Sequence, residues 1–526
     1  MKRKYLLLFL VVGLITGCQA PDGDIYILYD NDVHCSVEGY EQMAALRADY
    51  LKQSIYVNVV SCGDFVQGNK VGSISKGKYP VAIMNAVPYD YVTLGNHEFD
   101  YGVTQLKKLT WWLRAKTLCC NFSSIKTGKF IYPSYDIRSY GTVNVGFVGV
   151  ATPTTINNSL PINFQNDQGE VLYDFHKSEV VDLVQQAVNA AREEGADYVI
   201  VLSHLGDDTK GINSIQLIEQ TEGIDVVLDG HSHHVLDYKV ANLHGDSVLL
   251  ASTGNNFRYA GCLKITQQHQ FINQLIDLSS YRGVHKRLHS RIASILERVN
   301  KKTCQYIGFS QVTLTDSDNE GNRMVRKGET NLGDFTSDAM RFVSQSDIGI
   351  SNGGGLRGSL IKGNITYGDL LQVLPFNNTL YKVEMTGQQF IDVLEAGVSE
   401  YPTEYGDFMH VSGVRYTFDS SIPSPVFMNE DGLCDSIGAP RRIVSVEVEK
   451  DGVWRPIEVD SVYTIGGSDY NLVFGGLSGM FLDAKQVEVE HIVDVDVLIK
   501  YIESMGDTIR AATYADSQQR IREINQ

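Results

Sequence analysis

The sequence predicts an α/β protein of two domains joined by a helix. Three observations indicate this: a length of 526 residues, a first half in which short apolar runs alternate with amphipathic segments, and a second half rich in glycine loops. A single hydrophobic core stops growing near about 250–300 residues, so a chain of this length needs more than one. Strands that alternate with helices indicate a sheet buried on both faces.

Six runs in the first half are typical of buried strands, because they are short and rich in Val, Ile and Tyr. They are DIYILYD (24–30), IYVNVVSCGD (55–64), YDYVTLGN (89–96), VNVGFVGVA (143–151), DYVIVLSHLG (197–206) and IDVVLDGHSHH (224–234). Apolar residues at helical spacing predict helices over 40–53 and 177–195. The second ends in a glycine, as helices often do. We therefore expect a first domain over residues 24–283.

The stretch VHKRLHSRIASILERVNKKT, residues 284–303, contains no glycine or proline and is amphipathic and basic. It predicts a connecting helix over 284–304. Its charge could indicate membrane binding, but the solvated face of a linker is the commoner meaning. Beyond it the strands become shorter and the loops glycine-rich, as in GGGLRGS and FGGLSGMF. These features predict a second, α+β domain over residues 305–526.

The first residues predict an export signal rather than part of the fold. Lys2, Arg3 and Lys4 precede an apolar run, residues 5–15, that is too short to span a bilayer. The sequence LITGC resembles the lipobox of bacterial lipoproteins, in which the cysteine, here Cys18, is acylated and becomes the mature N-terminus. We therefore expect residues 1–18 to be a lipoprotein signal peptide, and the protein to be membrane-anchored in the periplasm or at the cell surface. A plain secretory signal with a chance cysteine is the alternative.

Composition limits the classes of function. The net charge of −18 argues against a surface that coats a nucleic acid, which would be basic. It does not exclude a phosphorylated substrate, because a metal or a few arginines can reverse the field locally. Seven cysteines follow Cys18, an odd number, and no CxxC occurs, which argues against a zinc knuckle or a redox motif. Several lie in apolar runs and are expected to be buried free thiols.

Potential metal ligands follow five of the strand-like runs. A lone Asp or His at a strand end is usually a turn or packing residue. The same kind of residue at the ends of five strands favours a metal site instead. The carboxyl ends of parallel strands share one edge of a sheet, where ligands bind. Seven nitrogen and oxygen donors suit two divalent cations better than one, and a carboxylate such as Asp64 can bridge them. The donors are Asp32, His34, Asp64, Asn96, His204, His231 and His233.

These motifs match a known family. D-x-H, G-D, G-N-H-E, H and G-H-x-H, in this order, resemble the calcineurin-like metallophosphoesterases. NLGDFTSDAM, SNGGGLRGSL and LLQVLPFNNTL resemble the substrate domain of the bacterial 5′-nucleotidase/UDP-sugar hydrolase family. The resemblance implies a four-layer αββα catalytic domain, a linker helix, and a C-terminal domain that holds the nucleotide. It implies hydrolysis of nucleoside 5′-monophosphates outside the cytoplasm, with UDP-sugars or nucleoside polyphosphates as further candidates.

Carried over by position, the resemblance implies that Asp32, His34, Asp64 and His233 bind one cation, and that Asp64, Asn96, His204 and His231 bind the other. These donors suit zinc, manganese or iron alike, so the metal stays open. His97 and Asp100 match the catalytic dyad of the family. His97 as imidazolium can stabilise the phosphoryl charge and protonate the leaving alkoxide, while Asp100 orients it. Glu98 is expected to be structural. His234 is left out, because neighbouring strand residues point to opposite faces.

In the second domain, the resemblance implies five substrate contacts. The arginines suit phosphate because a guanidinium binds it in two places, and the aromatic rings suit a stacked base. Arg323 could be a further phosphate contact, although its spacing from Arg326 fits less well. Relatives commonly carry an Asp that reaches the ribose where this chain has Leu477, so the resemblance implies no ribose contact at this position. The five contacts are Arg326, Asn352, Arg357, Phe376 and Tyr470.

Two other functions stay open at this stage. One is a 2′,3′-cyclic phosphodiesterase/3′-nucleotidase of similar architecture. Such relatives often show Asn after GNHEF, whereas this chain has Asp100, which modestly favours the 5′-nucleotidase. The other is a lipid-anchored nucleotide-binding protein that has lost catalysis, although every ligand position holds a competent donor. The oligomeric state is open. Because metals and base-stacking residues lie in different domains, turnover is expected to need domain rotation.

Overall fold

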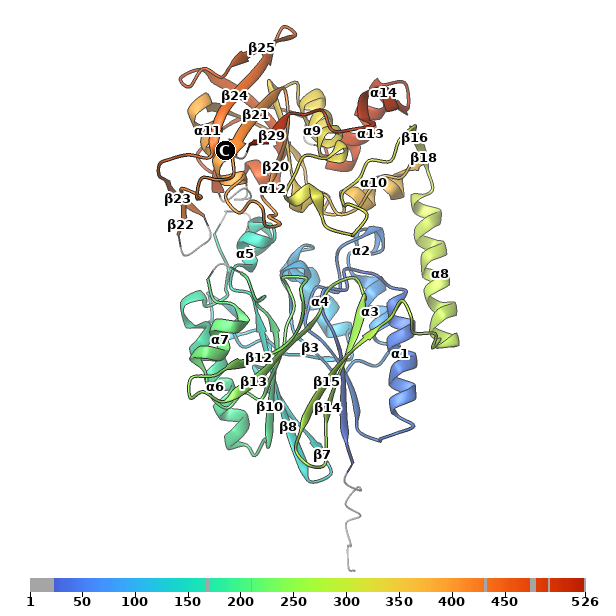
Figure 1. Cartoon of the computed structure of the whole chain (residues 1–526). Helices are drawn as coiled ribbons and strands as arrows, with labels where there is room; N and C mark the ends of the chain where they lie inside the picture. Colours follow the sequence, from blue (N-terminus) through green and yellow to red (C-terminus); the bar gives the residue numbers. More distant parts are fainter. Residues whose placement is uncertain are drawn as a thin grey trace, which may run out of the picture.

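The computed structural model describes residues 23–166, 168, 170–209, 211–429, 433–473, 479–490 and 492–524. Within them the chain forms two domains joined by the long helix α8 (Lys286–Thr303) (Figure 1). Cys18 with the expected signal peptide, and Leu477, lie outside the described residues. No helix in the described ranges is both long and apolar enough to cross a bilayer.

Two six-stranded sheets form the centre of the first domain. One has the order β15-β14-β1-β2-β3-β4, and the other β12-β13-β11-β10-β8-β7. The first comprises β1 (Ile25–Asp30), β2 (Val57–Ser61), β3 (Tyr91–Val92), β4 (Lys116–Thr117), β14 (Tyr259–Ile265) and β15 (Phe271–Asp277). The second comprises β7 (Tyr135–Tyr140), β8 (Val143–Ala151), β10 (Tyr198–His204), β11 (Val226–Leu228), β12 (Val235–Ala241) and β13 (Ser247–Thr253). A small third sheet holds β5 (Ser123–Ser124), β6 (Lys129–Phe130) and β9 (Tyr173–Asp174).

The two large sheets pack face to face, with helices outside each. Along β1, Ile27 faces the other sheet, whereas Leu28 packs under the helices, as the period of two in a strand requires. Helices α1 (Gly39–Tyr50), α3 (Lys78–Met84) and α8 cover the first sheet, and α6 (Val180–Glu193) and α7 (Ser214–Gln220) cover the second. This is the four-layer αββα arrangement that the resemblance implied, and it is confirmed. The remaining helical segments are α2 (Lys70–Ser75), η1 (Asn96–Phe99), α4 (Val103–Trp112), α5 (Thr155–Asn158), η2 (Pro161–Phe164) and η3 (Lys177–Glu179).

All six strand-like runs of the sequence contain a strand, but β2, β3 and β11 are markedly shorter than predicted. The run 89–96 continues apolar to Leu94, which is fully buried although it lies outside the two-residue strand β3. The chain leaves the sheet there to enter the loop that carries Asn96. The predicted strand was too long because its apolar residues are buried beyond the point where the hydrogen-bonded strand ends.

Helix α8 confirms the predicted connecting helix. Leu288, Ile292, Ile295 and Val299 are buried against the first domain, while its lysines and arginines are exposed. The basic charge is therefore a solvated face. Of the seven cysteines, five are buried and all seven are free thiols, as expected: Cys35, Cys62, Cys119, Cys120, Cys262, Cys304 and Cys434.

The second domain is α+β, with two hydrophobic cores. Its sheets have the orders β20-β17-β26-β19-β27, β25-β24-β21-β29, β18-β16-β28 and β22-β23. The strands are β16 (Tyr306–Ser310), β17 (Ile348–Asn352), β18 (Gly363–Thr366), β19 (Leu380–Thr386), β20 (Met409–Ser412), β21 (Val414–Asp419), β22 (Val426–Met428), β23 (Cys434–Ile437), β24 (Ile443–Lys450), β25 (Val453–Pro456), β26 (Val462–Ser468), β27 (Lys485–Val487), β28 (Thr508–Ile509) and β29 (Ile521–Ile524). The helical segments are η4 (Met324–Arg326), α9 (Asn331–Ser344), η5 (Gly353–Gly355), α10 (Tyr367–Val373), α11 (Gly387–Gly397), α12 (Asp469–Leu472), α13 (Asp494–Ser504) and α14 (Ala511–Tyr514).

Candidate active site

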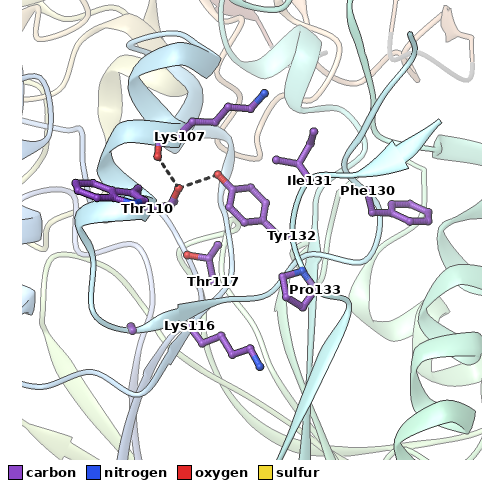
Figure 2. Close-up of a pocket in the computed structure, with 10 residues that line it drawn as sticks. Lys107, Thr110, Lys116, Thr117, Phe130, Ile131, Tyr132 and Pro133 are labelled. Atoms are coloured by element: carbon purple, nitrogen blue, oxygen red, sulfur yellow. Dashed lines mark hydrogen bonds between the residues drawn. The ribbon is translucent and has the colours of Figure 1, made fainter. Parts of the chain in front are cut away.

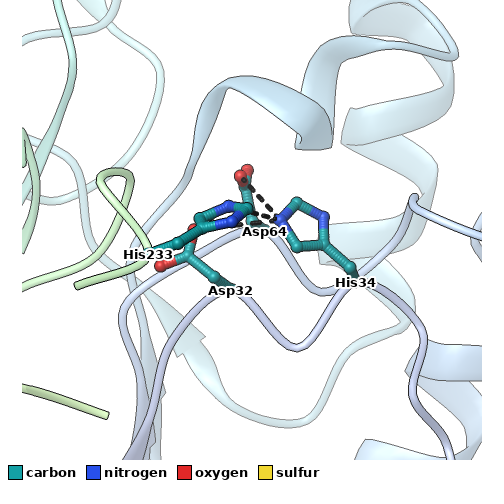
Figure 3. Close-up of side chains that lie close together, drawn as sticks. All are labelled: Asp32, His34, Asp64 and His233. Carbon is teal, nitrogen blue, oxygen red and sulfur yellow. Dashed lines mark hydrogen bonds and ion pairs between the residues drawn. The ribbon is translucent and has the colours of Figure 1, made fainter. Parts of the chain in front are cut away.

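The loops after β1, β2, β3 and β11, together with the last residue of β10, His204, bring the predicted ligands together. Figure 3 shows Asp32, His34, Asp64 and His233 pointing toward one another, and one ligand atom of each lies within 4.8 Å of the others. His34 Nε2 is 3.0 Å from His233 Nε2 and 3.8 Å from Asp64 Oδ2. Asp32 Oδ1 is 3.6 Å from His233 Nε2. These are the four residues of the first predicted ligand set.

The second predicted set also meets at Asp64. His204 Nε2 lies 3.3 Å from Asp64 Oδ2, and the rings of His204 and His231 are 5.2 Å apart. Two buried atoms of this set, Asn96 Oδ1 and His204 Nε2, have no hydrogen-bond partner among the described residues. Buried polar atoms are normally paired, so these two fit donors to a cation. Together with Asp64, which both sets share, the residues present fit two neighbouring divalent cations.

The orientation of two ligand rings is fixed by backbone carbonyls. His204 Nδ1 lies 2.6 Å from the carbonyl oxygen of Cys62, and His34 Nδ1 lies 3.2 Å from that of Gln67. A carbonyl can only accept, so in these bonds each Nδ1 carries the proton. In the neutral ring the lone pair is then on Nε2, the nitrogen that lies near Asp64, as a metal ligand requires.

The backbone at the site is strained. Five of the seven predicted ligands have positive φ angles, a region that residues other than glycine rarely adopt. Each such residue costs of the order of 1–2 kcal/mol, and the strain persists only where the surroundings impose it. Its concentration at one site indicates that the fold holds these side chains inward for a function. The angles are 48° at Asp32, 43° at His34, 60° at Asp64, 80° at His231 and 63° at His233.

Glycines in the motifs allow the backbone to approach the ligands. A Cβ atom on Gly95 would lie 2.1 Å from Asp64 Oδ1, and one on Gly230 would lie 2.8 Å from His204 Nδ1. Both distances are far below van der Waals contact. The glycines of G-N-H-E and G-H-x-H are therefore required by packing against the ligand residues.

Glu98 holds the loop that carries Asp64. Its two carboxylate oxygens accept hydrogen bonds from the backbone N–H groups of Asp64, Phe65, Val66 and Gly95, at 2.7–3.2 Å. Burial, and next the charge of Asp64, raises the pKa of Glu98 to about 7. These contacts agree with a structural part for Glu98.

Burial and neighbouring charges shift the titration of the groups in the cluster. Burial raises the pKa of Asp32 to about 7, against the attraction of His204. Burial also acts to raise the pKa of Asp64, but His204 and His97 together hold it well below its usual value. The pKa of His204 is lowered by burial yet raised overall to about 10 by Asp64 and Asp32. Perturbed groups gathered in one place are typical of functional sites.

His97 and Asp100 form a pair beside the cluster. His97 Nδ1 lies 2.7 Å from Asp100 Oδ2, and Ser159 Oγ donates to Asp100 Oδ1 at 2.8 Å. The backbone N–H of His97 donates to Asp64 Oδ1 at 2.9 Å, which joins the pair to the candidate metal ligands. Burial lowers the pKa of His97, but Asp100 and Asp64 outweigh it, so the pKa is raised. The imidazole is thus favoured in its protonated form.

Residues of the second domain reach this pair. The ring of Phe376 stacks on the imidazole of His97 with a centroid distance of 5.5 Å, and the guanidinium of Arg357 lies 5.5 Å from the centre of the Phe376 ring. Burial and next Arg323 lower the pKa of Arg357 to about 10. Burial, Arg323 and Arg357 lower the pKa of Arg326. The arginines therefore crowd one another, an arrangement that an anion would relieve.

The other two predicted contacts line the same part of the second domain. Asn352 Nδ2 donates to the carbonyl of Gly406 at 3.1 Å, and Asn352 Oδ1 accepts from Asn471 at 3.2 Å. Burial raises the pKa of the Tyr470 hydroxyl, followed by the charges of Asp407 and Asp100. In the described ranges no ring contact joins Tyr470 to Phe376, so a base-binding slot between them stays a prediction.

Two contacts to His233 were not predicted. Arg323 Nη1 lies 3.2 Å from His233 Nδ1, while its Nε donates to Glu404 Oε2 at 2.6 Å. Asn255 Nδ2 lies 3.0 Å from the same ring nitrogen. In the sequence, Arg323 could be considered only as a phosphate contact, and its spacing from Arg326 matched the family poorly. Nothing in the sequence indicated Asn255. His234 is half-exposed and pairs with Asp207 at 2.9 Å, outside the cluster, as expected.

Comparisons with known proteins agree with this architecture. Residues 26–235 match the calcineurin-like phosphoesterase family, and residues 307–483 match the 5′-nucleotidase C-terminal domain. The chain is similar to the crystal structure of a 5′-nucleotidase precursor from Thermus thermophilus, with a TM-score of 0.78 and 23% identity over 96% of this chain and 100% of that one. It is also similar to a sulfate thiohydrolase, SoxB, of Thermus thermophilus, with a TM-score of 0.72 and 17% identity over 96% and 97% of the two chains. These similarities show that the chain shares the two-domain fold of these structures.

Among curated proteins, the chain is 25% identical to the NAD 5′-nucleotidase of Haemophilus influenzae, over 95% of this chain and 93% of that protein. It is 22% identical to the trifunctional nucleotide phosphoesterase protein YfkN of Bacillus subtilis over 92% of this chain, but spans only 34% of that longer protein. The two domain matches together cover well over half of the sequence. The chain therefore belongs to the family in which a calcineurin-like, metal-dependent phosphoesterase domain is followed by a 5′-nucleotidase C-terminal domain.

Proposed function

We propose that this protein hydrolyses nucleoside 5′-monophosphates to a nucleoside and phosphate, with two divalent cations as cofactors. The observation that carries the proposal is the contact between Phe376 of the second domain and His97 of the first, directly beside the Asp64 cluster. A substrate with a phosphate at one end and a flat base at the other suits such an arrangement. UDP-sugars and nucleoside polyphosphates share this form and are further candidate substrates.

The two cations would be zinc, manganese or a similar metal. When bound, they would polarise the phosphoryl oxygens and lower the pKa of the attacking water. Asp64 would contribute to both positions, which its distances to His34 and His204 support. The first position would be held by Asp32, His34, Asp64 and His233, and the second by Asp64, Asn96, His204 and His231.

His97 would act on the substrate itself. Its raised pKa favours the protonated ring, which would transfer its proton to the 5′ oxygen as the bond from phosphorus to this oxygen breaks. Asp100 holds the ring by its Nδ1, so that Nε2 is the atom that faces the substrate. The oxygen of water forms the new bond to phosphorus, and phosphate and nucleoside leave.

The second domain would position the nucleotide. Arg326 and Arg357 would bind its phosphate, and Asn352 would add a hydrogen bond. Phe376 and Tyr470 would stack on the base, an interaction worth about 1–3 kcal/mol that does not demand one particular base. With Leu477 at the position where relatives carry an Asp for the ribose, we infer weak selection of the sugar hydroxyls.

We further propose an exported lipoprotein with three parts: the catalytic domain over 24–283, the linker over 284–304 and the nucleotide-binding domain over 305–526. Support for the lipid anchor at Cys18 comes from the LITGC sequence. The anchor would tie the protein to a membrane in the periplasm or at the cell surface. A nucleic-acid polymer does not fit the net charge of −18.

The test compares phosphate release from 5′-AMP, 3′-AMP and 2′,3′-cyclic AMP by protein loaded with manganese or zinc. We expect 5′-AMP to be the preferred substrate, and His97→Ala to slow its hydrolysis by roughly 10²–10⁴-fold. His234→Ala, which alters a neighbouring histidine outside the cluster, is the matched control and should keep full activity.

Two results would contradict the proposal. Release from only the 3′ and cyclic substrates would instead indicate a cyclic phosphodiesterase/3′-nucleotidase. A metal-loaded parent protein no more active than His97→Ala across all three substrates would indicate a protein that binds nucleotides without hydrolysing them.

A further inference from the structure

The surface around α4 has a charge opposite to that of the whole chain. Residues 101–135 contain six lysines and arginines and no aspartate or glutamate, in a protein whose net charge is −18. All six basic side chains are exposed. Only Lys116 among them forms an ion pair in the described parts of the chain, with Asp136. The six are Lys107, Lys108, Arg114, Lys116, Lys126 and Lys129.

Large apolar side chains are exposed among these charges. Trp111 and Trp112 end α4 with exposed fractions of 88% and 45%, and Ile125 and Phe130 stand at 55% and 41% in the neighbouring hairpin of β5 and β6. Trp111 and Phe130 line the same hollow of about 600 Å³. We call these four residues and the six basic ones the basic–aromatic patch. Apolar surface gathered in one place indicates a binding face.

Side-chain contacts hold the patch together. Figure 2 shows Lys107, Lys116 and Phe130 around Tyr132, whose hydroxyl hydrogen-bonds to Thr110 of α4 at 3.0 Å. Lys107 Nζ donates to the hydroxyl of Tyr173 at 3.2 Å. Helix α4 is therefore tied to Tyr132, which follows the hairpin, and to β9, which pairs with β5 of the hairpin.

One end of the patch lies at the edge of the sheet opposite the candidate ligands. Strands β1, β2, β3 and β4 are parallel, so they begin at one edge of the sheet and end at the other, where the candidate ligands lie. Lys116 begins β4 and Ile25 begins β1, so both lie at the edge opposite the cleft. Cys18 precedes Ile25 by seven residues, which span at most about 25 Å. A lipid on Cys18 would keep this edge close to a bilayer.

We propose that the basic–aromatic patch docks on a bilayer of anionic phospholipids. Lysine and arginine are attracted to anionic headgroups, and tryptophan favours the boundary between headgroups and hydrocarbon. Ile125 and Phe130 can enter that boundary, whereas an acidic polymer would leave them exposed to water. Only the distance that Cys18 can span depends on the proposed lipid anchor. The charge and the exposure of the patch support membrane docking without it.

The test uses the chain from residue 19 onward, produced without lipid, so that binding reports the patch and not the anchor. It is mixed with vesicles of phosphatidylglycerol and phosphatidylcholine, or of phosphatidylcholine alone, and bound protein is measured by sedimentation. We expect salt-sensitive binding to the anionic vesicles with a blue shift of tryptophan emission. The double variants Trp111→Ala/Trp112→Ala and Lys107→Glu/Lys108→Glu should each bind at least tenfold more weakly.

Two controls match these changes elsewhere on the surface. Phe427→Ala/Val453→Ala removes exposed apolar side chains from the second domain, and Lys301→Glu/Lys302→Glu reverses charges on α8. Both should bind the vesicles like the parent chain. Equal loss in a control variant, no binding to anionic vesicles, or binding to long-chain polyphosphate in place of vesicles would each overturn the proposal.

Phosphate release from p-nitrophenyl phosphate and thermal melts are recorded for every variant. Unchanged values in the patch variants show that the fold is intact, so that a change in vesicle binding reports the surface. Failure of the parent chain to release phosphate would count against the proposed hydrolysis and leave the vesicle result standing.

Discussion

The ring of Phe376 lies on the imidazole of His97, with centroids 5.5 Å apart and an angle of 27° between the planes. The two residues are far apart in the chain and belong to different domains. Pro375, next to Phe376, accepts hydrogen bonds from Ser73 and Gln67 of the first domain at 2.7 and 3.3 Å. The second domain therefore closes directly over the candidate dyad, and a base stacked on Phe376 would lie near the reacting phosphate.

Replacing Phe376 should separate base recognition from catalysis. In Phe376→Ala the loss of about 1–3 kcal/mol of stacking predicts a KM for 5′-AMP that rises roughly 5- to 150-fold. Hydrolysis of β-glycerophosphate, which has no ring, should change much less. Phe376→Tyr keeps a flat ring and is the control. Equal losses on both substrates would show that Phe376 supports the dyad and not the base.

Asp64 belongs to both proposed ligand sets, so its removal should differ from that of any other ligand. We expect two equivalents of metal per parent chain, about one in Asn96→Ala, and almost none in Asp64→Ala. The measurement is plasma mass spectrometry after gel filtration in metal-free buffer, with His234→Ala as a control that keeps both. Retention of both metals by Asp64→Ala would rule out a bridging carboxylate at this position.

Glu98 should matter for stability rather than for chemistry. In Glu98→Gln the amide nitrogen would face backbone N–H groups that now donate to a carboxylate oxygen, which leaves about two donors without acceptors. At roughly 1–3 kcal/mol for each unpaired buried group, thermal melts should show a loss of several degrees, with weaker metal retention. Glu193→Gln, on the exposed face of α6, should melt like the parent chain. An unchanged melting temperature would mean that the loop does not depend on these bonds.

The cluster of candidate ligands could be predicted from the sequence because each lies at or just after the end of a buried strand, and strand ends are local features. The αββα layering could not be derived from local pattern alone and came from the resemblance. Leu94 shows the limit of reading strands from apolar runs, since it is buried in a loop. The positive φ angles of Asp32 and His233 could not be predicted either, because the identity of a side chain does not indicate that the fold will impose such a backbone conformation.

Contacts between distant segments were the least predictable part. Arg323 reaches His233 only because the second domain folds over the first, and Asn255 reaches it from the loop after β13. Neither contact leaves a spacing pattern in the sequence, because both depend on how the domains and sheets pack. The basic–aromatic patch is intermediate: its charges are contiguous in sequence, but the exposure of Trp111 is known only from the fold.

A buried carboxyl in the second domain should make stability depend on pH. Asp494 at the start of α13 is 1% exposed, and burial, then Asp469, raises its pKa well above the usual value. The neutral form is therefore favoured in the folded protein, so this contribution is fully present below about pH 4, the unfolded-state pKa, and is lost as pH rises through the folded-state pKa.

Asp494→Asn removes this dependence. The melting temperature of the variant relative to the parent should rise between pH 4.5 and pH 8, by up to the equivalent of about 1.4 kcal/mol per pH unit. Asp496→Asn, exposed on the same helix, is the control and should show a flat difference. A flat difference for Asp494→Asn as well would mean that its carboxyl is not penalised by burial.

Turnover should require the two domains to move apart, because Phe376 and His97 are in contact where a nucleotide has to enter. Ser73 Oγ donates to the carbonyl of Pro375, so the pair Ser73→Cys and Pro375→Cys would place two thiols at the domain contact for oxidation to a disulfide, in a background where the exposed Cys304 is replaced by Ser. Oxidation should slow hydrolysis of 5′-AMP at least tenfold, and dithiothreitol should restore it. The single Ser73→Cys variant controls for the substitution itself. Full activity in a protein shown by mass spectrometry to be completely crosslinked would mean that nucleotides enter and leave without separation of the domains at this contact.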